Sequence, residues 1–170
     1  MPRPFPENSS YRAEIRAILQ LHRLWLEGKG ESAEADAFRD ATDGPWELLS
    51  DAERKRLRGL SEDLNALSEQ SSNNAAAPMN PQAQAKLVEA SEARQRGEWD
   101  LALDTLRLLG KSIAPALLSY LRGAIWSEAG DLETAAIFFQ HAARLDPNNG
   151  NYRALSSKFL AGIVDPVGVP

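Results

Sequence analysis

The sequence contains no cysteine among its 170 residues. Disulfide bonds, thiolate metal sites and cysteine nucleophiles are therefore excluded. Disulfides persist mainly in oxidising compartments, so the lack of cysteine fits a reducing one, and we expect a cytoplasmic protein. Histidine is almost as scarce: the chain has two, far apart, and their spacing does not match the His-Glu-x-x-His zinc motif. We expect neither a metal site nor a bound cofactor.

Long apolar runs are also missing. No stretch approaches the roughly 18–20 apolar residues that a membrane-spanning helix needs. The first ten residues hold three prolines and no apolar run, so we expect no signal peptide either. Alternating runs rich in β-branched residues are absent as well, and the sequence predicts an all-α fold. Glycine-rich phosphate loops and the Gly-x-Ser-x-Gly nucleophile elbow are not present.

The chain carries little excess positive charge in any segment. Its formal net charge is −5 at pH 7 and its pI is about 5.1. A nucleic-acid-binding domain usually presents a net basic face, so this balance argues against nucleic acid as a partner.

Residues 1–69 predict an N-terminal region of about three helices. Asn8 or a neighbouring serine can cap a helix over residues 8–27, and residues 32–41 predict a second, short helix. The sequence Asp-Gly-Pro at residues 43–45 predicts a turn. Ser50 and Glu53 then form a capping box, which opens a helix with a leucine seam that ends near residue 69.

The four tryptophans are candidates for the core or for an interface. Trp25, Trp99 and Trp126 lie on apolar helix faces, and we expect them in the core. Trp46 follows the predicted turn, where it could pack under the loop or stand exposed as an interface anchor.

The second half of the chain repeats itself. Residues 70–81, rich in Ser, Asn and Ala with two prolines, predict a linker. After it, Gly-Glu-Trp-Asp-Leu-Ala at residues 97–102 recurs 33 residues later as Gly-Asp-Leu-Glu-Thr-Ala. Such a period predicts helical hairpins stacked side by side over residues 82–161, and we expect a flexible tail over residues 162–170.

One of these units resembles a tetratricopeptide repeat (TPR). The residues that carry the likeness in the second unit are Gly123, Trp126, Gly130, Asp131, Ala135, Phe139, Ala142, Leu145, Asp146 and Pro147. The first unit has a weaker set, namely Ala90, Ala93, Gly97, Ala102, Leu106 and Leu109. Residues 151–161 resemble the helix that caps such a stack. The resemblance implies a non-enzymatic module, an adaptor or scaffold, that binds another protein.

The TPR resemblance also implies where a partner binds, because the first helix of each hairpin lines the concave groove of such stacks. The expected partner-binding residues are Leu87, Ser91, Arg94, Leu117, Tyr120, Ala124 and Ser127. We expect a helix or an extended segment that anchors on Tyr120 and Leu87. Since Arg94 is the only basic residue there and Glu128 would repel a carboxylate, chaperone tails ending in acidic residues are not expected.

Two alternative functions start from the N-terminal half. A small helical hydrolase could use His22 together with a crowded acidic segment, which consists of Glu31, Glu34, Asp36, Asp40 and Asp43. The glycine-punctuated spacing of a calcium loop is missing from that segment, and a solvated helix face is the preferred interpretation. We therefore predict no enzyme activity.

The other alternative is a nucleic-acid adaptor. Its basic cluster consists of Arg54, Lys55, Arg56 and Arg58, which could touch phosphate groups. Acidic residues flank the cluster and no aromatic residue interrupts it, so a solvated helix face is again preferred. The same half of the chain, over residues 30–37, 45–50 and 56–61, resembles a segment of uncharacterised bacterial proteins, and this likeness carries no function.

Overall fold

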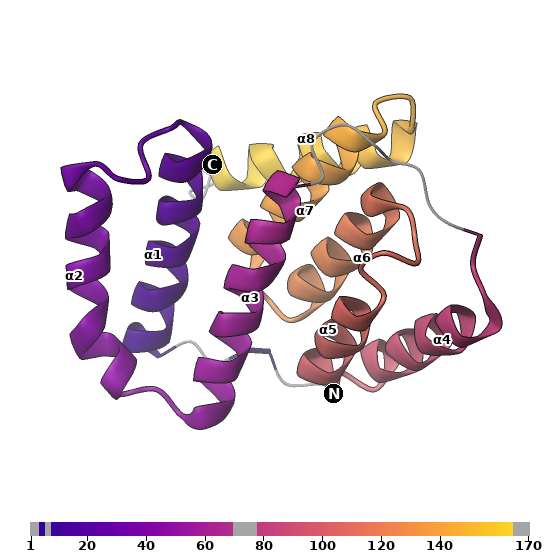
Figure 1. Ribbon diagram of the computed structural model, residues 1–170, viewed down its shortest axis with the longest axis horizontal. Coiled ribbons are helices and arrows are strands. Elements are labelled where there is room, and N and C mark those ends of the chain that lie inside the picture. Colours follow the sequence, from indigo (N-terminus) through magenta and orange to yellow (C-terminus); the bar gives the residue numbers. More distant parts are fainter. Residues whose placement is uncertain (1–3, 6–7, 70–77, 165–170) are drawn as a thin grey trace, which may run out of the picture. The chain divides into compact units, whose positions relative to one another are not determined.

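The structure is a computed structural model that describes residues 4–5, 8–69 and 78–164, apart from the side chains of residues 68–69 and 162–164. Within these residues it contains eight helices and no strand (Figure 1), which confirms the all-α prediction. The helices are α1 (Ser9–Leu26), α2 (Ala33–Glu47), α3 (Asp51–Glu69), α4 (Pro81–Gln95), α5 (Trp99–Leu108), α6 (Pro115–Glu128), α7 (Leu132–Leu145) and α8 (Gly150–Val164).

The chain forms two compact units. The N-terminal unit is Pro6–Glu69 and holds α1 to α3, whereas the C-terminal unit combines Gln70–Pro170, with α4 to α8, and the first residues, Met1–Phe5. The sequence placed all of residues 1–69 in the N-terminal region, and for Phe5 this is wrong. Its backbone N–H donates a 2.9 Å hydrogen bond to the carbonyl oxygen of Ala129, at the end of α6. A single aromatic residue in a proline-rich start has no periodicity that would reveal such a contact.

Local capping signals set the starts of α1 and α3 in the N-terminal unit. The Asn8 side chain accepts a hydrogen bond from the backbone N–H of Tyr11. The predicted capping box is confirmed: Ser50 Oγ accepts from Glu53 N at 3.2 Å, and Glu53 Oε2 accepts from Ser50 N at 2.8 Å. These bonds satisfy backbone donors that a helix start leaves without a partner.

The predicted turn at residues 43–45 is wrong, because α2 continues through it to Glu47. Pro45 normally disfavours a helical conformation in the preceding residue by clashing with its Cβ, but that residue is Gly44, which has none. The last turn is also held from outside. Arg54 of α3 donates hydrogen bonds to the carbonyl oxygens of Trp46 and Glu47, at 3.2 and 3.1 Å.

Trp25 is not in the core, in contrast to the prediction, since its side chain is 59% exposed. Leu24 takes the buried position at the end of α1 instead. The Trp25 ring lies over Gly30, where a Cβ atom would come within 2.5 Å of Trp25 Cδ1. The apolar stripe of α1 was therefore read one residue out of phase at its end. Trp46 is half-buried.

α1 packs against both α2 and α3 within the N-terminal unit. The predicted leucine seam of α3 is confirmed, since all its members are buried; they are Leu57, Leu60, Leu64 and Leu67.

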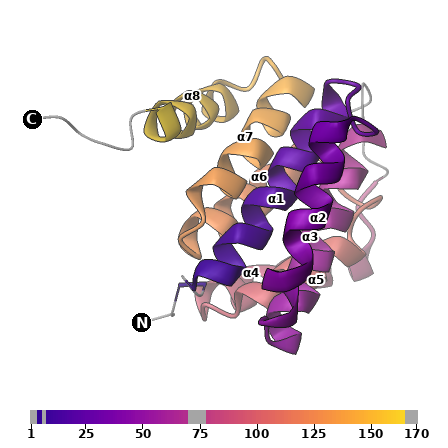
Figure 2. The same ribbon diagram turned by 90° about the vertical axis from the view of Figure 1, so that its left-hand side faces the viewer.

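Helical hairpins follow one another in the C-terminal unit. α4 packs on α5, α6 on α7, and α8 on α7 (Figures 1 and 2). The turns inside both hairpins use a glycine in the left-handed region, with φ of 72° at Gly97 and 92° at Gly130. Other residues rarely adopt this conformation, so the two recurring glycines mark equivalent turns 33 residues apart.

A close approach of α6 and α7 depends on Gly123. A Cβ atom at this position would lie 2.9 Å from two ring carbons of Phe139. The small residues that the sequence pattern singled out are also buried in both hairpins, and the fully buried ones are Ala93, Ala102, Ala135 and Ala142. The pattern of small and large residues thus corresponds to real helix packing.

Two predicted boundaries differ from the structure. Pro81, assigned to the linker, is the first residue of α4, with Asn80 as its N-cap; proline suits this position because it needs no N–H there. The C-terminal helix reaches Val164 and so includes three residues of the expected tail. The rest of the predicted linker, residues 70–77, and of the tail, residues 165–170, lies outside the described residues.

Candidate functional site

The first helices of the two hairpins are joined by an ion pair. Arg94 on α4 donates from Nε to both carboxylate oxygens of Glu128 on α6, at 3.0 and 2.9 Å, and its Nη2 donates to the same carboxylate. The hydrogen bond to Glu128 is the main cause that raises the pKa of Arg94. The two charges that the sequence treated separately therefore compensate each other.

This ion pair borders a hollow of about 530 Å³. The residues that line it are Ser91, Arg94, Gln95, Trp99 and Glu128. Trp99 is only 7% exposed, as expected for a core residue, yet it forms part of this lining. The lining combines one ring with a neutralised charge pair and small polar groups.

Tyr120 lies in a chain of aromatic rings that links α6, α7 and α8. Its ring centroid is 5.4 Å from that of Tyr152 on α8 and 6.1 Å from that of Phe139 on α7. Phe139 in turn lies 4.7 Å from Phe159. Burial is the main cause that raises the pKa of Tyr152, with smaller contributions from Asp146 and Tyr120. Tyr120 is half-buried, so it supports the packing of α8 and still presents surface.

A second hollow, also about 530 Å³, lies beside this aromatic chain. The residues that line it are Tyr120, Asn149, Asn151, Tyr152, Ala154, Leu155 and Lys158. Asn149 also caps α8, since its Oδ1 accepts from the backbone N–H groups of Asn151 and Tyr152. Lys158 is the one charged residue of this lining. The hollow offers aromatic surface, amide groups and a single positive charge.

The contribution of α8 was missed in the choice of site residues. Adding one period of 34 residues to Leu117, Tyr120 and Ala124 gives Asn151, Ala154 and Lys158, and all three line the second hollow. The sequence thus contained the necessary signal, but residues 151–161 were interpreted only as a cap. We use the name α4/α6/α8 face for the surface that contains the two hollows.

The expected partner-binding residues are only partly brought together. Ser91 and Arg94 line the first hollow and Tyr120 the second. The other four line neither; Leu87, Leu117 and Ser127 are half-buried, and Ala124 is 7% exposed. Tyr120 and Leu87 are therefore not two anchors in one hollow.

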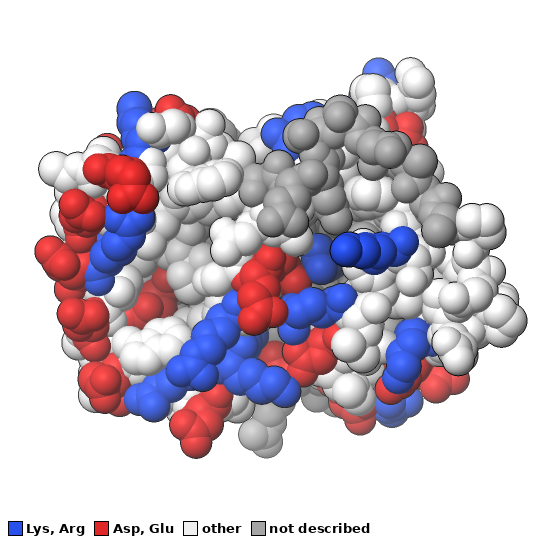
Figure 3. All heavy atoms as spheres, in the orientation of Figure 1, with Lys and Arg blue, Asp and Glu red and all other residues white. Residues whose placement is uncertain are grey.

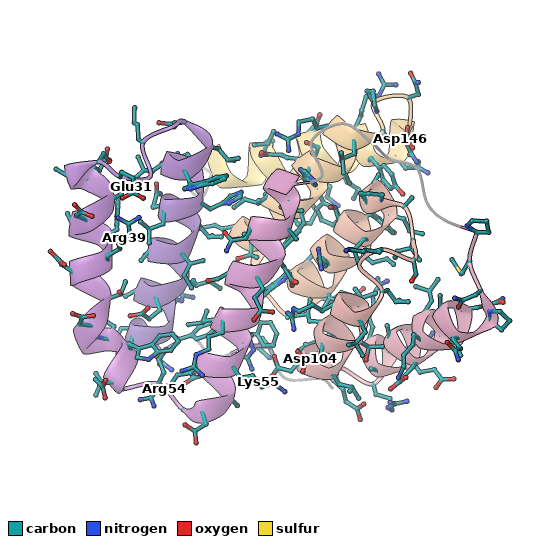
Figure 4. All side chains as sticks on the ribbon, in the orientation of Figure 1. Glu31, Arg39, Arg54, Lys55, Asp104 and Asp146 are labelled. Carbon is teal, nitrogen blue, oxygen red and sulfur yellow. The ribbon has the colours of Figure 1, made fainter. Side chains whose placement is uncertain are left out.

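His22 lies away from the acidic residues that the hydrolase hypothesis would need. It lines a smaller hollow in the N-terminal unit, of about 240 Å³, with Ile18, Leu21, Trp25, Gly30, Arg39, Ser61, Leu64 and Asn65. None of the five acids belongs to that lining. Arg39 donates to Asp36 Oδ1 at 2.8 Å and to the Gly30 carbonyl oxygen at 2.7 Å (Figure 4). Among the described residues, no group of three or more His, Asp or Glu side chains could hold a metal ion.

The basic cluster on α3 makes contacts inside the N-terminal unit. Besides the hydrogen bonds of Arg54 to the end of α2, the guanidinium of Arg58 lies 5.4 Å from the Trp46 ring centroid, and that of Arg56 lies 5.5 Å from the Tyr11 ring centroid. Figure 3 shows basic side chains near the start of α3 and acidic ones along α2. Three members of the cluster thus help to hold α1, α2 and α3 together.

No helix in the described part of the chain has the length and apolar character required to cross a membrane. No protein-family model, curated protein or solved structure matches the chain.

Proposed function

We propose that the C-terminal unit is a TPR-like interaction module, which binds a helical or extended segment of another protein on the α4/α6/α8 face and has no enzyme activity of its own. The observation that carries this proposal is the composition of the two hollows. They are lined mainly by the first helices of successive hairpins and by α8, largely at positions related by the repeat. We place this activity in the cytoplasm, in keeping with the absence of cysteine.

The chemistry of the face indicates the kind of segment it accepts. Since Glu128 neutralises Arg94, Lys158 is the one uncompensated charge among the lining residues of the two hollows. A strongly acidic segment would find little to pair with. The rings of Tyr120 and Tyr152 suit an apolar or aromatic anchor, and the amide of Asn151 can bond to the backbone of an extended segment.

The experiment compares variants of the full chain in an affinity pull-down from a lysate of the source cells, followed by affinity measurement with each recovered partner. Lys158→Glu places the opposite charge in the second hollow and should weaken binding. Arg153→Glu is its matched control, because this exposed residue lies on the same helix but lines neither hollow. The control should bind like the wild type.

Tyr120→Ala removes the expected anchor and should weaken binding by tens of fold, because a buried aromatic anchor commonly contributes about 2 kcal/mol or more. Arg54→Ala, in the other unit, should leave the affinity unchanged. Since Tyr120 packs on Phe139 and Tyr152, its variant must first show a wild-type circular dichroism spectrum. A correctly folded Tyr120→Ala chain that binds like the wild type would refute the proposal.

A further inference from the structure

Phe5 is packed onto the C-terminal unit as part of a short, non-helical segment. Its side chain is 7% exposed, and its ring meets the Trp126 ring edge-on, with centroids 5.1 Å apart and an interplanar angle of 66°. Trp126 itself is completely buried. Phe5 therefore contributes an aromatic contact to the core of the second hairpin although it precedes that hairpin by more than a hundred residues.

The backbone of the segment is recognised as well as its side chain. Ala129 is the C-cap residue of α6, and carbonyl groups at a helix end lack partners within the helix. The Phe5 N–H donates to the Ala129 carbonyl oxygen at 2.9 Å and so satisfies one of them. Main-chain hydrogen bonding combined with a side-chain pocket is the usual way in which proteins recognise extended segments.

Pro4 completes the contact next to Gly130. A Cβ atom at Gly130 would lie 3.4 Å from Pro4 Cβ, so the glycine leaves room for the proline ring. Gly130 adopts a φ of 92°, which other residues rarely tolerate, so the turn and the space beside Pro4 are fixed together. Trp126, Ala129 and Gly130 line neither hollow of the α4/α6/α8 face.

We propose that the C-terminal end of α6 is a second recognition site, specific for an extended segment with a proline followed by an aromatic residue, and that Pro4 and Phe5 of the same chain occupy it. The site is distinct from the α4/α6/α8 face and does not depend on the function proposed for that face. A covalently attached segment binds at a high effective concentration. A separate segment of the same chemistry therefore gains access only when Phe5 leaves.

The test uses the full chain with Phe5→Ala, which vacates the site, and a synthetic peptide with the sequence of residues 1–10 as the probe. Isothermal titration calorimetry measures the affinity. The peptide should bind the Phe5→Ala chain at least about tenfold more tightly than the wild type, in which the tethered segment competes. The same peptide with Phe5→Ala is the matched probe control and should not bind.

The result also has a direct optical signature, because the peptide ring would restore the contact with Trp126. Binding should return the tryptophan emission of the Phe5→Ala chain towards the wild-type spectrum. If Phe5→Ala does not fold, Phe5→Leu keeps an apolar side chain in the site, and the peptide should still bind this variant more tightly than the wild type.

Two outcomes would overturn the proposal. One is that the peptide binds neither variant, or binds them no more tightly than the wild type. The other is a wild-type dimer in light scattering that becomes a monomer in Phe5→Ala, since the segment would then occupy the site of a second copy. A monomeric wild type and a peptide selective for the vacated site support occupancy within one chain.

Discussion

Arg94 and Glu128, 34 residues apart in the sequence, connect α4 to α6 through a bidentate ion pair. Each residue taken alone indicates a different ligand, since a free arginine would attract a carboxylate and a free glutamate would repel it. Paired, they make this part of the α4/α6/α8 face nearly neutral. The pair also joins the first helices of two successive hairpins, so it contributes to the stacking of the repeats as well as to the chemistry of the face.

The first prediction concerns the strength of this pair. Its side chains are 31% and 41% exposed, so solvent screens the attraction, and Glu128→Gln should lower the free energy of unfolding by no more than about 1 kcal/mol. A double-mutant cycle with Arg94→Gln, measured by urea unfolding, should give a favourable coupling that shrinks as salt is added. Glu133→Gln, an exposed residue of α7, is the control. Zero coupling at low salt would show that the pair does not hold α4 to α6.

The second prediction concerns the packing of α6 on α7. Gly123→Ala would bring a Cβ atom to 2.9 Å from the Phe139 ring, and such overpacking should reduce stability by about 1–3 kcal/mol. Gly150→Ala is the matched control, because no heavy atom lies within 4 Å of its added Cβ, and it should change stability by less than about 0.5 kcal/mol. Thermal unfolding followed by circular dichroism measures both. Equal melting temperatures for the two variants would contradict the packing described here.

Local and periodic features of the fold could be predicted from the sequence. The capping box of Ser50 and Glu53 needs only residues three apart, and the leucine seam of α3 needs only a helical period. The spacing of Gly97 and Gly130 likewise located both hairpin turns. Each feature is determined by neighbours along the chain or by repetition, which a single sequence displays.

Features that depend on contacts between distant residues could not be predicted in this way. The continuation of α2 through Pro45 depends on Arg54 of another helix, and the burial of Phe5 depends on Trp126. The pairing of Arg94 with Glu128 is of the same kind. In the candidate site, the residues on α4 and α6 were found partly, while those on α8 followed from the repeat period but were not inferred.

Glu14 is a carboxylic acid in an unfavourable place for a charge. It lies on the α1 helix with 3% exposure, and its Oε1 atom has no hydrogen-bond partner among the described residues. Burial is the main cause that raises the pKa of Glu14, and the nearby carboxylate of Asp43 raises it further, whereas a hydrogen bond from the Trp46 backbone lowers it. The folded chain therefore holds the Glu14 proton more tightly than the unfolded chain does.

The third prediction follows from this pKa shift. Where the pH lies between the unfolded and the raised folded pKa of Glu14, the folded state binds more protons, so stability falls as the pH rises. Glu14→Gln removes the ionisation, and at about pH 7 it should be more stable than the wild type. The gap should close on acidification to about pH 5, as Glu14 becomes protonated in the wild type. Urea unfolding at each pH measures both curves, with the exposed Glu34→Gln as control, whose curve should run parallel to the wild type. A gap that stays constant over this range would show that folding does not change the proton affinity of Glu14.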